Sequence, residues 1–583
     1  MTEFEINRTV LDTPGFEIFS DGTQLGSEFA VRSVVVSKSV NKIPTARLIL
    51  EDGDIASSDF PSSNSNELLP GAEIEIKMGY RGNYETVFIG IIVKHGIKTR
   101  QHERSLLTLE LKDSAIKMTI GRKNKYFKDA SDSDIIEEIL DENGLDKDVE
   151  TTAVNHTEMV QYYCTDWDFI ISRAEANGML VFVNDRTVEV KPPDLSQETI
   201  LTLAYGNNIH EFDTEIDARD QHNAVESNAW DFALQEMISS EAADPGIPEQ
   251  GNISNSDLAD VIGLDSLPFK HSGRVNSEEL QSWADARLLR SKLAKVRGRI
   301  RILGFNGIKP GDVVELEGMG DRFNGTAFVS SVGHYYGPGA PWYTDLEIGL
   351  SQEWLIEHFD NVMAKPSSAL LPGINGLQIG IVTAIHNDPD SEDRIQIRLP
   401  VVDPGDEGIW ARIATLDAGD SRGSFFRPEV DDEVIVGFIN DDPRDAIVLG
   451  MLNSSAKPAP ITATEENNEK GFITRDELKL LFDDDKKSVS IETPNGNTVV
   501  LSDEEGSIIL EDENGNKITM DSSGITLDSA SDLTIKAAAE IKIESGSNMD
   551  LSAGAQFKAE GGAGAELSSG AVVVVQGSLV QIN

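Results

Sequence analysis

The feature that most constrains this chain is an eight-residue repeat near its C-terminus. Between residues 525 and 575, apolar pairs whose members are separated by one residue return every eight positions. The pairs are Ile525/Leu527, Leu533/Ile535, Ile541/Ile543, Met549/Leu551, Phe557/Ala559, Ala565/Leu567 and Val573/Val575. Alternate residues of a strand point to the same side, so each pair predicts a short strand with one apolar face. Small residues follow the same period where the chain must turn: Ala530, Ala538, Gly546, Gly554, Gly562 and Gly570.

Looser apolar pairs precede this repeat and extend the predicted element upstream. They are Val489/Ile491, Val499/Leu501, Ile508/Leu510 and Ile518/Met520, with turn signals at Asn495-Gly496 and Asn514-Gly515. We therefore expect one repetitive β-element from residue 489 to residue 583.

The length of the repeat limits how this element can close. Eight extended residues span only about 26 Å, which is too short a path for one chain to coil around a packed core. Three chains that each supply one eight-residue side give roughly 24 residues per turn, enough for a triangular prism. The sequence thus predicts an intertwined triple-stranded β-helix, a homotrimer with these residues packed on its axis: Ile525, Leu527, Leu533, Ile535, Ile541, Ile543, Met549, Leu551, Phe557, Val573 and Val575. The alternative is a stack of β-hairpins or a flat repetitive sheet, whose long open edges would favour aggregation.

The last residues of the given sequence predict a capping partner. A trimeric prism that stopped there would leave three open strand edges and apolar side chains uncovered, an arrangement that natural proteins avoid. We expect a partner to bind at Val580, Ile582 and Asn583.

Composition narrows the class of protein. The chain has 583 residues, enough for several domains, and 100 acidic against 50 basic side chains. A net charge of -50 opposes binding to nucleic acid and to anionic membranes, although it also fits a salty habitat. The single cysteine, Cys164, rules out an intramolecular disulfide. The N-terminus shows no secretory signal and no segment is apolar enough to span a membrane, so we expect synthesis in the cytoplasm.

Two further regions precede the repeat. Residues 373–453 contain five short alternating strands, the number expected of an oligonucleotide/oligosaccharide-binding (OB) barrel, between expected linkers at 364–372 and 454–488. This barrel lacks the basic groove and stacking aromatics that bind single strands. Residues 1–363 are predicted to be mainly β, with two barrels and two clear helices. Those helices begin after Thr165 and Asn276, residues suited to N-caps.

The motifs of residues 387–453 resemble those of the VgrG (valine-glycine repeat protein G) spike family. They are Asn387-Asp388-Pro389, Arg394–Arg398, Trp410–Ala414, Ala418-Gly419, Phe426–Phe438, Asp442-Pro443 and Val448–Asn453. The N-terminal region also resembles the hub half of such spikes, through Asn41–Pro44, Pro70-Gly71, Gly79-Tyr80, Phe88–Gly90, Thr165–Phe169, Ala174–Gly178 and Lys309–Asp312. The resemblance covers nearly the whole chain.

This resemblance implies a structural, non-enzymatic spike of a contractile injection machine. Such a spike adapts a sixfold tail tube to a threefold puncturing needle, contacts tail-tube and baseplate proteins through its hub, and carries a conical tip protein of the PAAR type or effector cargo. It would be part of an assembled particle, delivered outside the cell or into a target. The machine would be a type VI secretion apparatus, an extracellular contractile particle or a phage tail. Residues 454–488 are too few for the lysozyme domain of some phage relatives, and we expect a spike without the toxic extension that many relatives carry after the repeat.

Two competing functions are a trimeric tailspike that hydrolyses glycans and an adhesive fibre. The first would need paired carboxylates flanked by aromatics, which the repeat lacks; the second would lack the barrel motifs at 387–453.

A search for catalytic, cofactor-binding and metal-binding residues gives none. The nine histidines form no metal-binding motif, and His210-Glu211 with His222 are better explained as surface residues. Asp512, Asn514 and Asn516 resemble the start of a calcium loop, but Lys517 stands where glycine is needed, so we expect a turn at Asn514-Gly515. Cys164 is expected to be a small buried residue rather than a reactive thiol.

Overall fold

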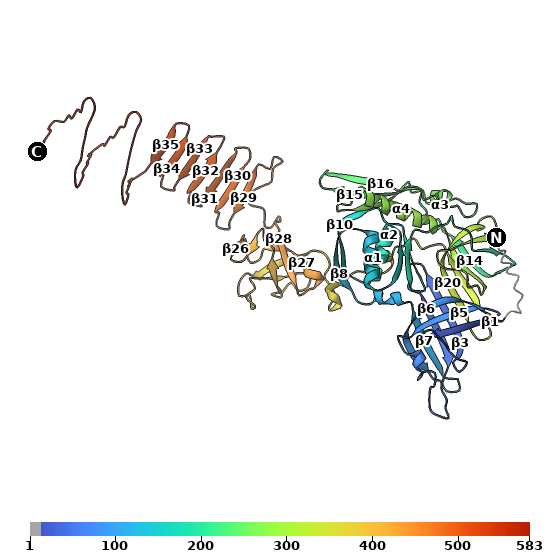
Figure 1. The fold of residues 1–583 in the computed structure, drawn as a ribbon. Helices are drawn as coiled ribbons and strands as arrows, with labels where there is room; N and C mark the ends of the chain where they lie inside the picture. Colours follow the sequence, from blue (N-terminus) through green and yellow to red (C-terminus); the bar gives the residue numbers. More distant parts are fainter. Residues whose placement is uncertain (1–12, 583) are drawn as a thin grey trace. The chain divides into compact units, whose positions relative to one another are not determined.

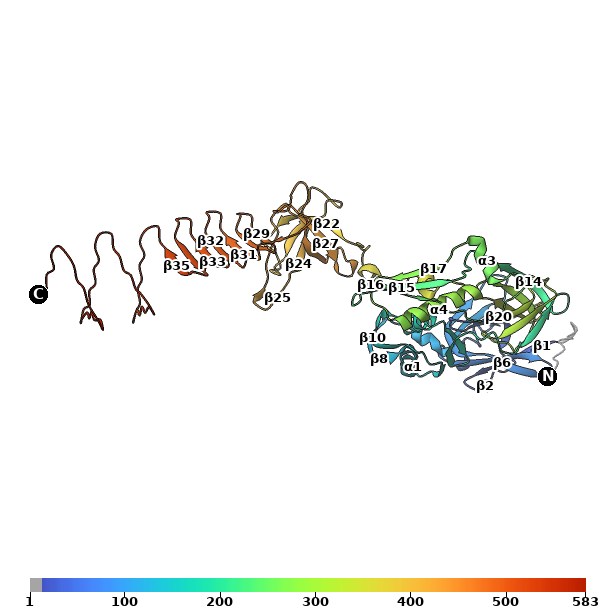
Figure 2. The same ribbon diagram turned by 90° about the horizontal axis from the view of Figure 1, so that it is seen from above.

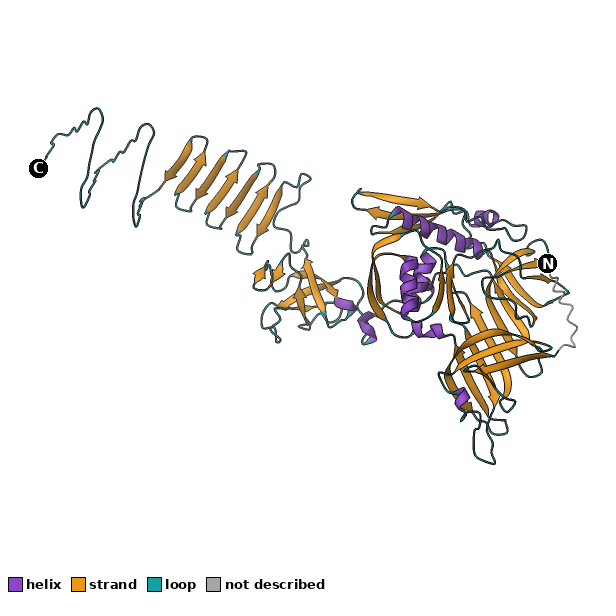
Figure 3. Cartoon of the chain, viewed as in Figure 1, coloured by secondary structure: helices purple, strands orange, loops and turns teal. Residues whose placement is uncertain are grey.

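The computed structural model describes residues 13–582, and the chain divides into two units. One unit is the chain up to Gln378 together with Val436–Ile447, and the other is Ile379–Ile435 together with the chain from Val448 on. Strands make up 39% of the chain and helices 12%, which confirms the mainly β prediction (Figure 3). None of the helices in residues 13–582 has the length and apolar character that a membrane crossing requires.

The first unit is built around one thirteen-stranded sheet, in the order β14-β18-β21-β20-β3-β4-β7-β6-β5-β1-β2, with β19 joined to β20 and β13 joined to β19 (Figures 1 and 2). The N-terminal strands are β1 (Pro14–Ser20), β2 (Thr23–Gln24), β3 (Ala30–Ser39), β4 (Thr45–Glu51), β5 (Glu73–Tyr80), β6 (Asn83–Lys98) and β7 (Leu106–Lys112). The later strands are β13 (Leu201–Ala204), β14 (Ile209–Ile216), β18 (Val296–Leu303), β19 (Val313–Glu317), β20 (Gly325–Tyr336) and β21 (Tyr343–Ile348).

The two predicted hub barrels correspond to two apolar cores on this one sheet. Leu48, Phe88 and Leu109 belong to the first core, and Ile300 and Leu346 belong to the second. The antiparallel pairing of β20 with β3 joins the two halves, so the sheet continues from one core to the other. The sequence located the strands, but it did not show that they form one continuous sheet.

The helix-richer parts of this unit lie in the sequence between β7 and β13 and between β14 and β18. Their sheets are β8 (Lys123–Ser131) with β10 (Asn155–Cys164), β9 (Asp146–Val149) with β11 (Leu180–Asn184) and β12 (Thr187–Lys191), and β15 (Val225–Asp231) with β16 (Glu236–Glu241) and β17 (Leu267–His271). Their helices are α1 (Asp132–Glu142), α2 (Asp166–Ala176), α3 (Asn255–Ile262) and α4 (Ser277–Leu293), and α5 (Leu355–His358) follows β21. Short 3-10 helices are η1 (Asn66–Leu68), η2 (Ser114–Thr119), η3 (Pro366–Ala369) and η4 (Ile439–Asp441).

The two predicted helices are confirmed, and three more were missed. Thr165 caps α2 by accepting a hydrogen bond from the backbone N–H of Asp168, and Asn276 caps α4 in the same way. Besides the two clear helices expected from the sequence, α1, α3 and α5 are also present. A capping box marks the start of α1, where Ser131 and Asp134 exchange hydrogen bonds. The spacing of these two residues is a local sequence signal for this helix.

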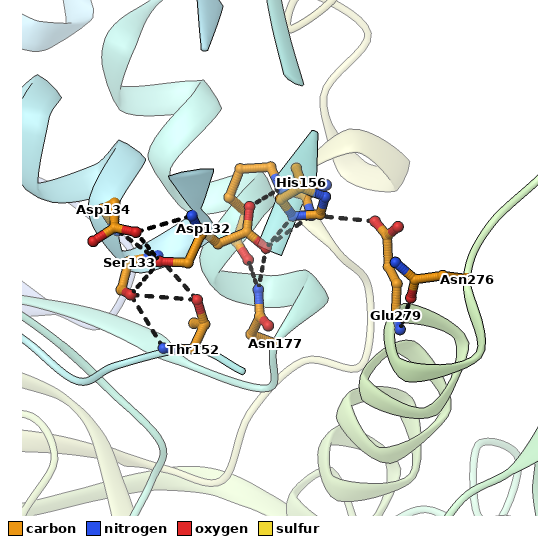
Figure 4. A network of polar contacts seen from close by, with 10 residues as sticks. Asp132, Ser133, Asp134, Thr152, His156, Asn177, Asn276 and Glu279 are labelled. Atoms are coloured by element: carbon orange, nitrogen blue, oxygen red, sulfur yellow. Dashed lines mark hydrogen bonds and ion pairs between the residues drawn. The ribbon is translucent and has the colours of Figure 1, made fainter. Parts of the chain in front are cut away.

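A buried ionic network fixes α1 and α2 together (Figure 4). Asp132 is only 1% exposed, and its carboxylate accepts hydrogen bonds from Arg173 Nε at 2.6 Å and Nη2 at 2.9 Å and from Asn177 Nδ2 at 2.8 Å. His156 Nε2 lies 3.2 Å from the same carboxylate, and Arg173 also contacts Glu279 of α4 at 3.4 Å. Burial alone would raise the pKa of Asp132, but the hydrogen bonds from His156 and Arg173 hold it well below its usual range. The network is therefore ionised and structural.

The OB barrel is present as predicted within residues 373–453. Its closed order is β22 (Gln378–Ala384), β23 (Ile395–Arg398), β24 (Ile409–Ile413), β28 (Ala446–Met451) and β27 (Glu433–Phe438), with a small ribbon of β25 (Ala418–Gly419) and β26 (Arg422–Gly423). Val382, Ile397 and Val434 are buried at its centre. Asp388 accepts a hydrogen bond from Arg394 Nη2 at 2.6 Å, which explains why both residues belong to the motif before β23.

The C-terminal region begins with a seven-stranded antiparallel meander. Its strands, in sequence and in spatial order, are β29 (Glu469–Ile473), β30 (Lys479–Asp483), β31 (Ser488–Glu492), β32 (Thr498–Ser502), β33 (Ser507–Glu511), β34 (Lys517–Asp521) and β35 (Gly524–Asp528). The segment 454–488, expected to be a linker, therefore contains β29 and β30. That expectation is wrong from residue 469 on, because these two strands lie there. Leu480 and Phe482 of β30 share one face, but the charged run that follows hides this pattern in the sequence.

One buried histidine couples the stability of the first unit to pH. His334 of β20 lies beneath the sheet surface, with Nδ1 3.1 Å from Thr344 Oγ1 and its ring near Trp342. Burial, assisted by the charge of Lys38 and opposed by that of Asp345, lowers the pKa of His334 to about 3. The unfolded chain therefore takes up a proton near the usual histidine pKa of about 6.5, whereas the folded chain does not.

We predict that the first unit loses stability as the pH falls from 6.5 towards 3, and that the loss is smaller in His334→Gln. For one site, the difference between pH 6.5 and pH 4.5 is about 2 kcal/mol. Urea unfolding at several pH values measures it, with the exposed His102→Gln as the control that keeps the wild-type pH dependence. An equal pH dependence in His334→Gln and wild type would contradict the assignment.

Candidate functional site

The meander presents one almost entirely apolar face, defined by two cross-strand ladders. The first ladder is Phe472, Leu480, Ile491, Val499, Leu510, Ile518 and Leu527, and the second is Lys470, Phe482, Val489, Leu501, Ile508, Met520 and Ile525. Members of the two ladders are two residues apart on each strand, so both ladders lie on the same side of the sheet. We call this side the apolar face of the meander.

The opposite face is mixed and carries charges along one margin. Its central ladder is Gly471, Leu481, Ser490, Val500, Ile509, Thr519 and Thr526. Beside it, Lys479 Nζ lies 3.3 Å from Glu492 of the next strand, and Lys517 Nζ lies 3.0 Å from Glu511. This face therefore has the composition of a solvated surface, and the other does not.

In the described chain this face is largely uncovered, although the ring of Phe426 stacks on Phe472 of its first strand with centroids 5.1 Å apart. Leu501, Ile491 and Ile525 remain exposed, Ile525 to 71%. A contiguous apolar surface of this kind is uncommon on a soluble monomer and marks an interaction site.

After β35 the chain continues as a long tail without regular structure of its own, which swings back and forth in Figures 1 and 2. In its described part, residues 530–582, no backbone N–H donates to a backbone carbonyl. Its octad side chains are exposed as well, Leu551 to 72%. More than fifty residues thus have exposed apolar pairs and no partner strand, although backbone groups are paired in nearly all native folds.

The structure places the predicted axis residues in two settings. Ile525 and Leu527 lie in β35, at the end of the apolar face of the meander. The other predicted axis residues lie in the tail, all exposed and not packed together within one chain: Leu533, Ile535, Ile541, Ile543, Met549, Leu551, Phe557, Val573 and Val575. Val580 and Ile582 are exposed too, and Asn583 lies outside the described residues.

The expectation that the octad winding begins at residue 489 is corrected by the meander. Residues 488–528 form antiparallel hairpins, which is the arrangement expected of the alternative β-hairpin stack, and the regular repeat follows them. The reason is the spacing, since the upstream pairs lie seven to ten residues apart and leave room for tight turns such as Thr493–Asn497.

The calcium-like sequence at residues 512–516 is one of these turns, as expected. Asp512 Oδ1 accepts hydrogen bonds from the backbone N–H of Asn514 at 2.9 Å and of Asn516 at 2.8 Å, and Gly515 has φ +87°. The side chain of Asn516, with these backbone groups, lowers the pKa of Asp512. In residues 13–582 no three His, Cys, Asp or Glu side chains are grouped as metal ligands would be.

The other side chains singled out from the sequence are structural. Cys164 is buried, and burial, with the charge of Asp168, raises the pKa of its thiol, so the group is a neutral thiol. His210 packs edge-on against Tyr343, whereas burial lowers the pKa of the half-buried His222. The structure gives no contact between His210 and His222 among the described residues.

The first unit contains a cavity of about 690 Å³, lined by residues that include Trp167, Glu175, Arg290 and Trp354. Its most buried carboxylate, that of Glu175, accepts hydrogen bonds from Arg290 Nη1 at 2.6 Å and from the backbone N–H of Leu355 at 2.8 Å. Glu175 therefore ties α2 to α4 and to the start of α5, and it is not poised for acid–base chemistry.

Three family models match the chain. Residues 11–337 match the Alg8 N-terminal domain, residues 378–452 match the type VI secretion system/phage-baseplate injector OB domain, and residues 488–583 match the phage baseplate V C-terminal trimerisation domain. The second match coincides with the closed barrel, and the third begins at β31 of the meander.

Two curated relatives are type VI secretion system spike proteins of Pseudomonas aeruginosa. VgrG1b is 21% identical over 392 residues, which are 60% of this chain and 49% of that protein. VgrG4b is 28% identical over 123 residues, which are 20% of this chain and 15% of that protein. The chain thus spans about half the length, or less, of the curated relatives that it matches.

Solved structures similar to the chain come from phage tails and type VI secretion. A tail protein of Neisseria meningitidis is 14% identical, with a TM-score of 0.44, over 59% of this chain and 98% of that protein. The E. coli c3393 protein, a type VI secretion component, has a TM-score of 0.39 at 14% identity over 75% and 99% of the two chains. A chain of the Francisella PdpA-VgrG complex has a TM-score of 0.39 at 10% identity over 89% of each. All three TM-scores lie below 0.5 and are too low to establish a shared fold.

We predict that the two faces of the meander respond differently to a charge. Leu501→Asp on the apolar face prevents copies of the chain from associating, whereas Val500→Asp, its neighbour on the opposite face, leaves association intact. Burying a leucine side chain contributes about 1.5–3 kcal/mol per copy, and an aspartate there would lose it and be desolvated. Sedimentation velocity of both variants measures the result, and equal behaviour of the two would contradict the assignment of faces.

Proposed function

We propose that three copies of this chain form the hub and needle of a contractile injection machine. The chain belongs to the Alg8 N-terminal domain family. It is a structural protein of the spike type found in VgrG proteins and phage baseplates. The whole particle, and not the isolated chain, is then the working unit.

The observation that carries this proposal is the unsatisfied C-terminal tail. From residue 530 to residue 582 the described backbone has no partner strand, and the apolar octad pairs have nothing to pack against. Three copies that wind together would supply both partners at once. Neighbouring strands of each side would come from different copies, and the octad pairs would meet on the axis.

The meander would use its apolar face in the same way. Three sheets whose apolar faces turn inward make a three-sided prism, in which each copy supplies one side. The tail would then continue the prism as an intertwined helix. The match of residues 488–583 to a trimerisation domain supports this arrangement.

The first unit would form the hub. Each copy carries two apolar cores on one continuous sheet, so a trimer would present six comparable structures around its axis. That number suits contact with a sixfold tail tube and baseplate, whereas the tail keeps threefold symmetry. The hub would thereby adapt one symmetry to the other.

The proposed mechanism is passive. Contraction of an outer sheath drives the particle forward, and the needle resists bending because its backbone groups are paired between copies and its axis is packed. The curated relatives are spike proteins, and Glu175 and Asp132 are committed to structural contacts. We therefore propose a puncturing and carrying role without catalysis.

We predict that Ile541→Asp or Ile543→Asp abolishes the trimer, because three carboxylates would meet on a dry axis at a cost of several kcal/mol. Thr534→Asp, at an outward position of the same kind of strand, is the matched control and should remain trimeric. Native mass spectrometry of the full chain reports the copy number. A trimer that survives both isoleucine substitutions would refute the axial packing.

We further propose that a small conical tip protein of the PAAR type binds at Val580, Ile582 and Asn583. Continuation of the octads would place the next apolar pair at positions 581 and 583, but these are Gln581 and Asn583. The apolar side chains lie instead at Val580 and Ile582, which are 47% and 89% exposed. This break in the period supports a separate role for these residues.

We predict that removing residues 576–583 leaves the trimer intact but abolishes co-purification of the co-expressed tip protein. The trimer mass of the shortened chain is the internal control, since the octad pairs up to Val575 are retained. Retention of the tip protein by the shortened trimer would disprove the assignment.

A further inference from the structure

The outward charges of the tail alternate in sign along two columns, and we infer that they form salt bridges between copies that fix the register of the three chains. This inference rests on the proposed trimer. The apolar pairs alone do not determine which octads of the three copies lie side by side, because every octad offers nearly the same apolar pair to the axis. Slippage by one octad would cost little in core packing alone.

The neighbours in such a trimer follow from its geometry. If three equivalent copies cover three sides, each chain must climb one strand spacing, about 4.8 Å, for every side that it forms. On any side, the strand beside octad n of one copy is then octad n+1 of the next copy. The two strands run parallel, and residues eight apart in the sequence become direct cross-strand neighbours.

Two columns of outward residues result from this rule. The first column is Thr526, Thr534, Lys542, Asp550, Lys558, Glu566 and Val574. The second column is Asp528, Lys536, Glu544, Ser552, Glu560, Ser568 and Gln576. These positions each follow a member of an apolar pair and so point away from the axis.

Every pair of charged neighbours in these columns has opposite signs. The pairs are Lys542/Asp550, Asp550/Lys558, Lys558/Glu566, Asp528/Lys536 and Lys536/Glu544. Residues 529–583 contain only three basic side chains, those of Lys536, Lys542 and Lys558, and all three stand in these columns. In a chain with twice as many acidic as basic residues, this placement gives each lysine at least one acidic neighbour on another copy.

Slippage reverses this pattern. If one copy moves by one octad, its pairing with both neighbouring copies changes. Against one neighbour, residues sixteen apart in the sequence become cross-strand neighbours. Against the other neighbour, residues with the same number become cross-strand neighbours. The contact with the first neighbour then pairs Lys542 with Lys558, Asp550 with Glu566, Asp528 with Glu544 and Glu544 with Glu560. Like charges directly opposite each other destabilise a sheet. The alternation therefore selects the symmetric register over its neighbours.

The described structure shows the same device and the required side-chain positions. In the meander, Lys479 meets Glu492 at 3.3 Å and Lys517 meets Glu511 at 3.0 Å, each across neighbouring strands of one copy. In the tail, Lys542 Nζ lies 2.7 Å from Glu544 Oε1, which shows that members of the two columns share one side of the strand. Lys558 and Glu560 form the equivalent pair. All four tail side chains are exposed and free to reach a neighbouring copy.

Three variants of the full chain test this inference. K542E/K558E makes all the charged residues of the first column acidic. K542E/D550K/K558E/E566K reverses every sign in that column, which keeps both the alternation and the net charge of the wild type. K486E/K487E, in the exposed turn after β30, makes the same change in net charge as the first variant but outside the columns.

Thermal unfolding of the trimer is followed in about 0.01 M and about 1 M NaCl, where screening is weak and strong respectively. At low salt we expect K542E/K558E to lower the melting midpoint by about 5 °C or more, with most of the difference lost at high salt. K486E/K487E should melt with the wild type at both salt concentrations. The reversed column restores the alternation between copies but loses the Lys542–Glu544 and Lys558–Glu560 pairs within a copy, so at low salt it should melt between K542E/K558E and the wild type.

The outcomes separate this inference from the proposed function. A wild-type chain that is monomeric by native mass spectrometry would overturn both. A trimeric wild type would overturn the charge columns alone if K542E/K558E melts with it at low salt, or if the reversed column is as unstable as the acidic one.

Discussion

The rest of this structure depends on one constraint: a narrow sheet cannot bury its own apolar face. The strands β29–β35 are five residues long, so each places only two side chains on the apolar face, and within residues 13–582 no helix or second sheet covers them. The tail beyond β35 goes further, since its described residues up to 582 make no hydrogen bonds between backbone groups. In the proposed trimer, copies of the same chain would meet both deficits, which would link folding of this region to assembly.

The first unit solves the same problem within one chain. Its long sheet encloses two apolar cores, and a third core forms where α1 and α2 pack against β11 and β12. Asp132, a charged group buried there, is partnered by Arg173 and Asn177. The contrast between a self-sufficient first unit and a dependent tail fits the proposed device, which would assemble first and then transmit force.

How much could be predicted depended on whether the signal was local. The octads, the caps at Thr165 and Asn276 and the five barrel strands are patterns within a few residues, and sequence reasoning found them. Helix α1 also has a local signal, the capping box of Ser131 and Asp134, and strands β29 and β30 have apolar alternation that the neighbouring charged residues conceal. The two hub barrels were expected from strand content, while the β20–β3 pairing that joins them lies between residues almost three hundred positions apart. No local pattern specifies such a pairing.

By itself, the sequence determined the period of the C-terminal repeat and the side of each strand that is apolar, because strand geometry alone converts an eight-residue spacing into aligned side chains. It also determined the alternating charges of the outward columns. Only the tertiary structure decided that residues 469–528 fold as antiparallel hairpins and that the hub has one continuous sheet. Those features depend on turn lengths and on contacts between distant strands, whose energies are set only when the whole chain is folded.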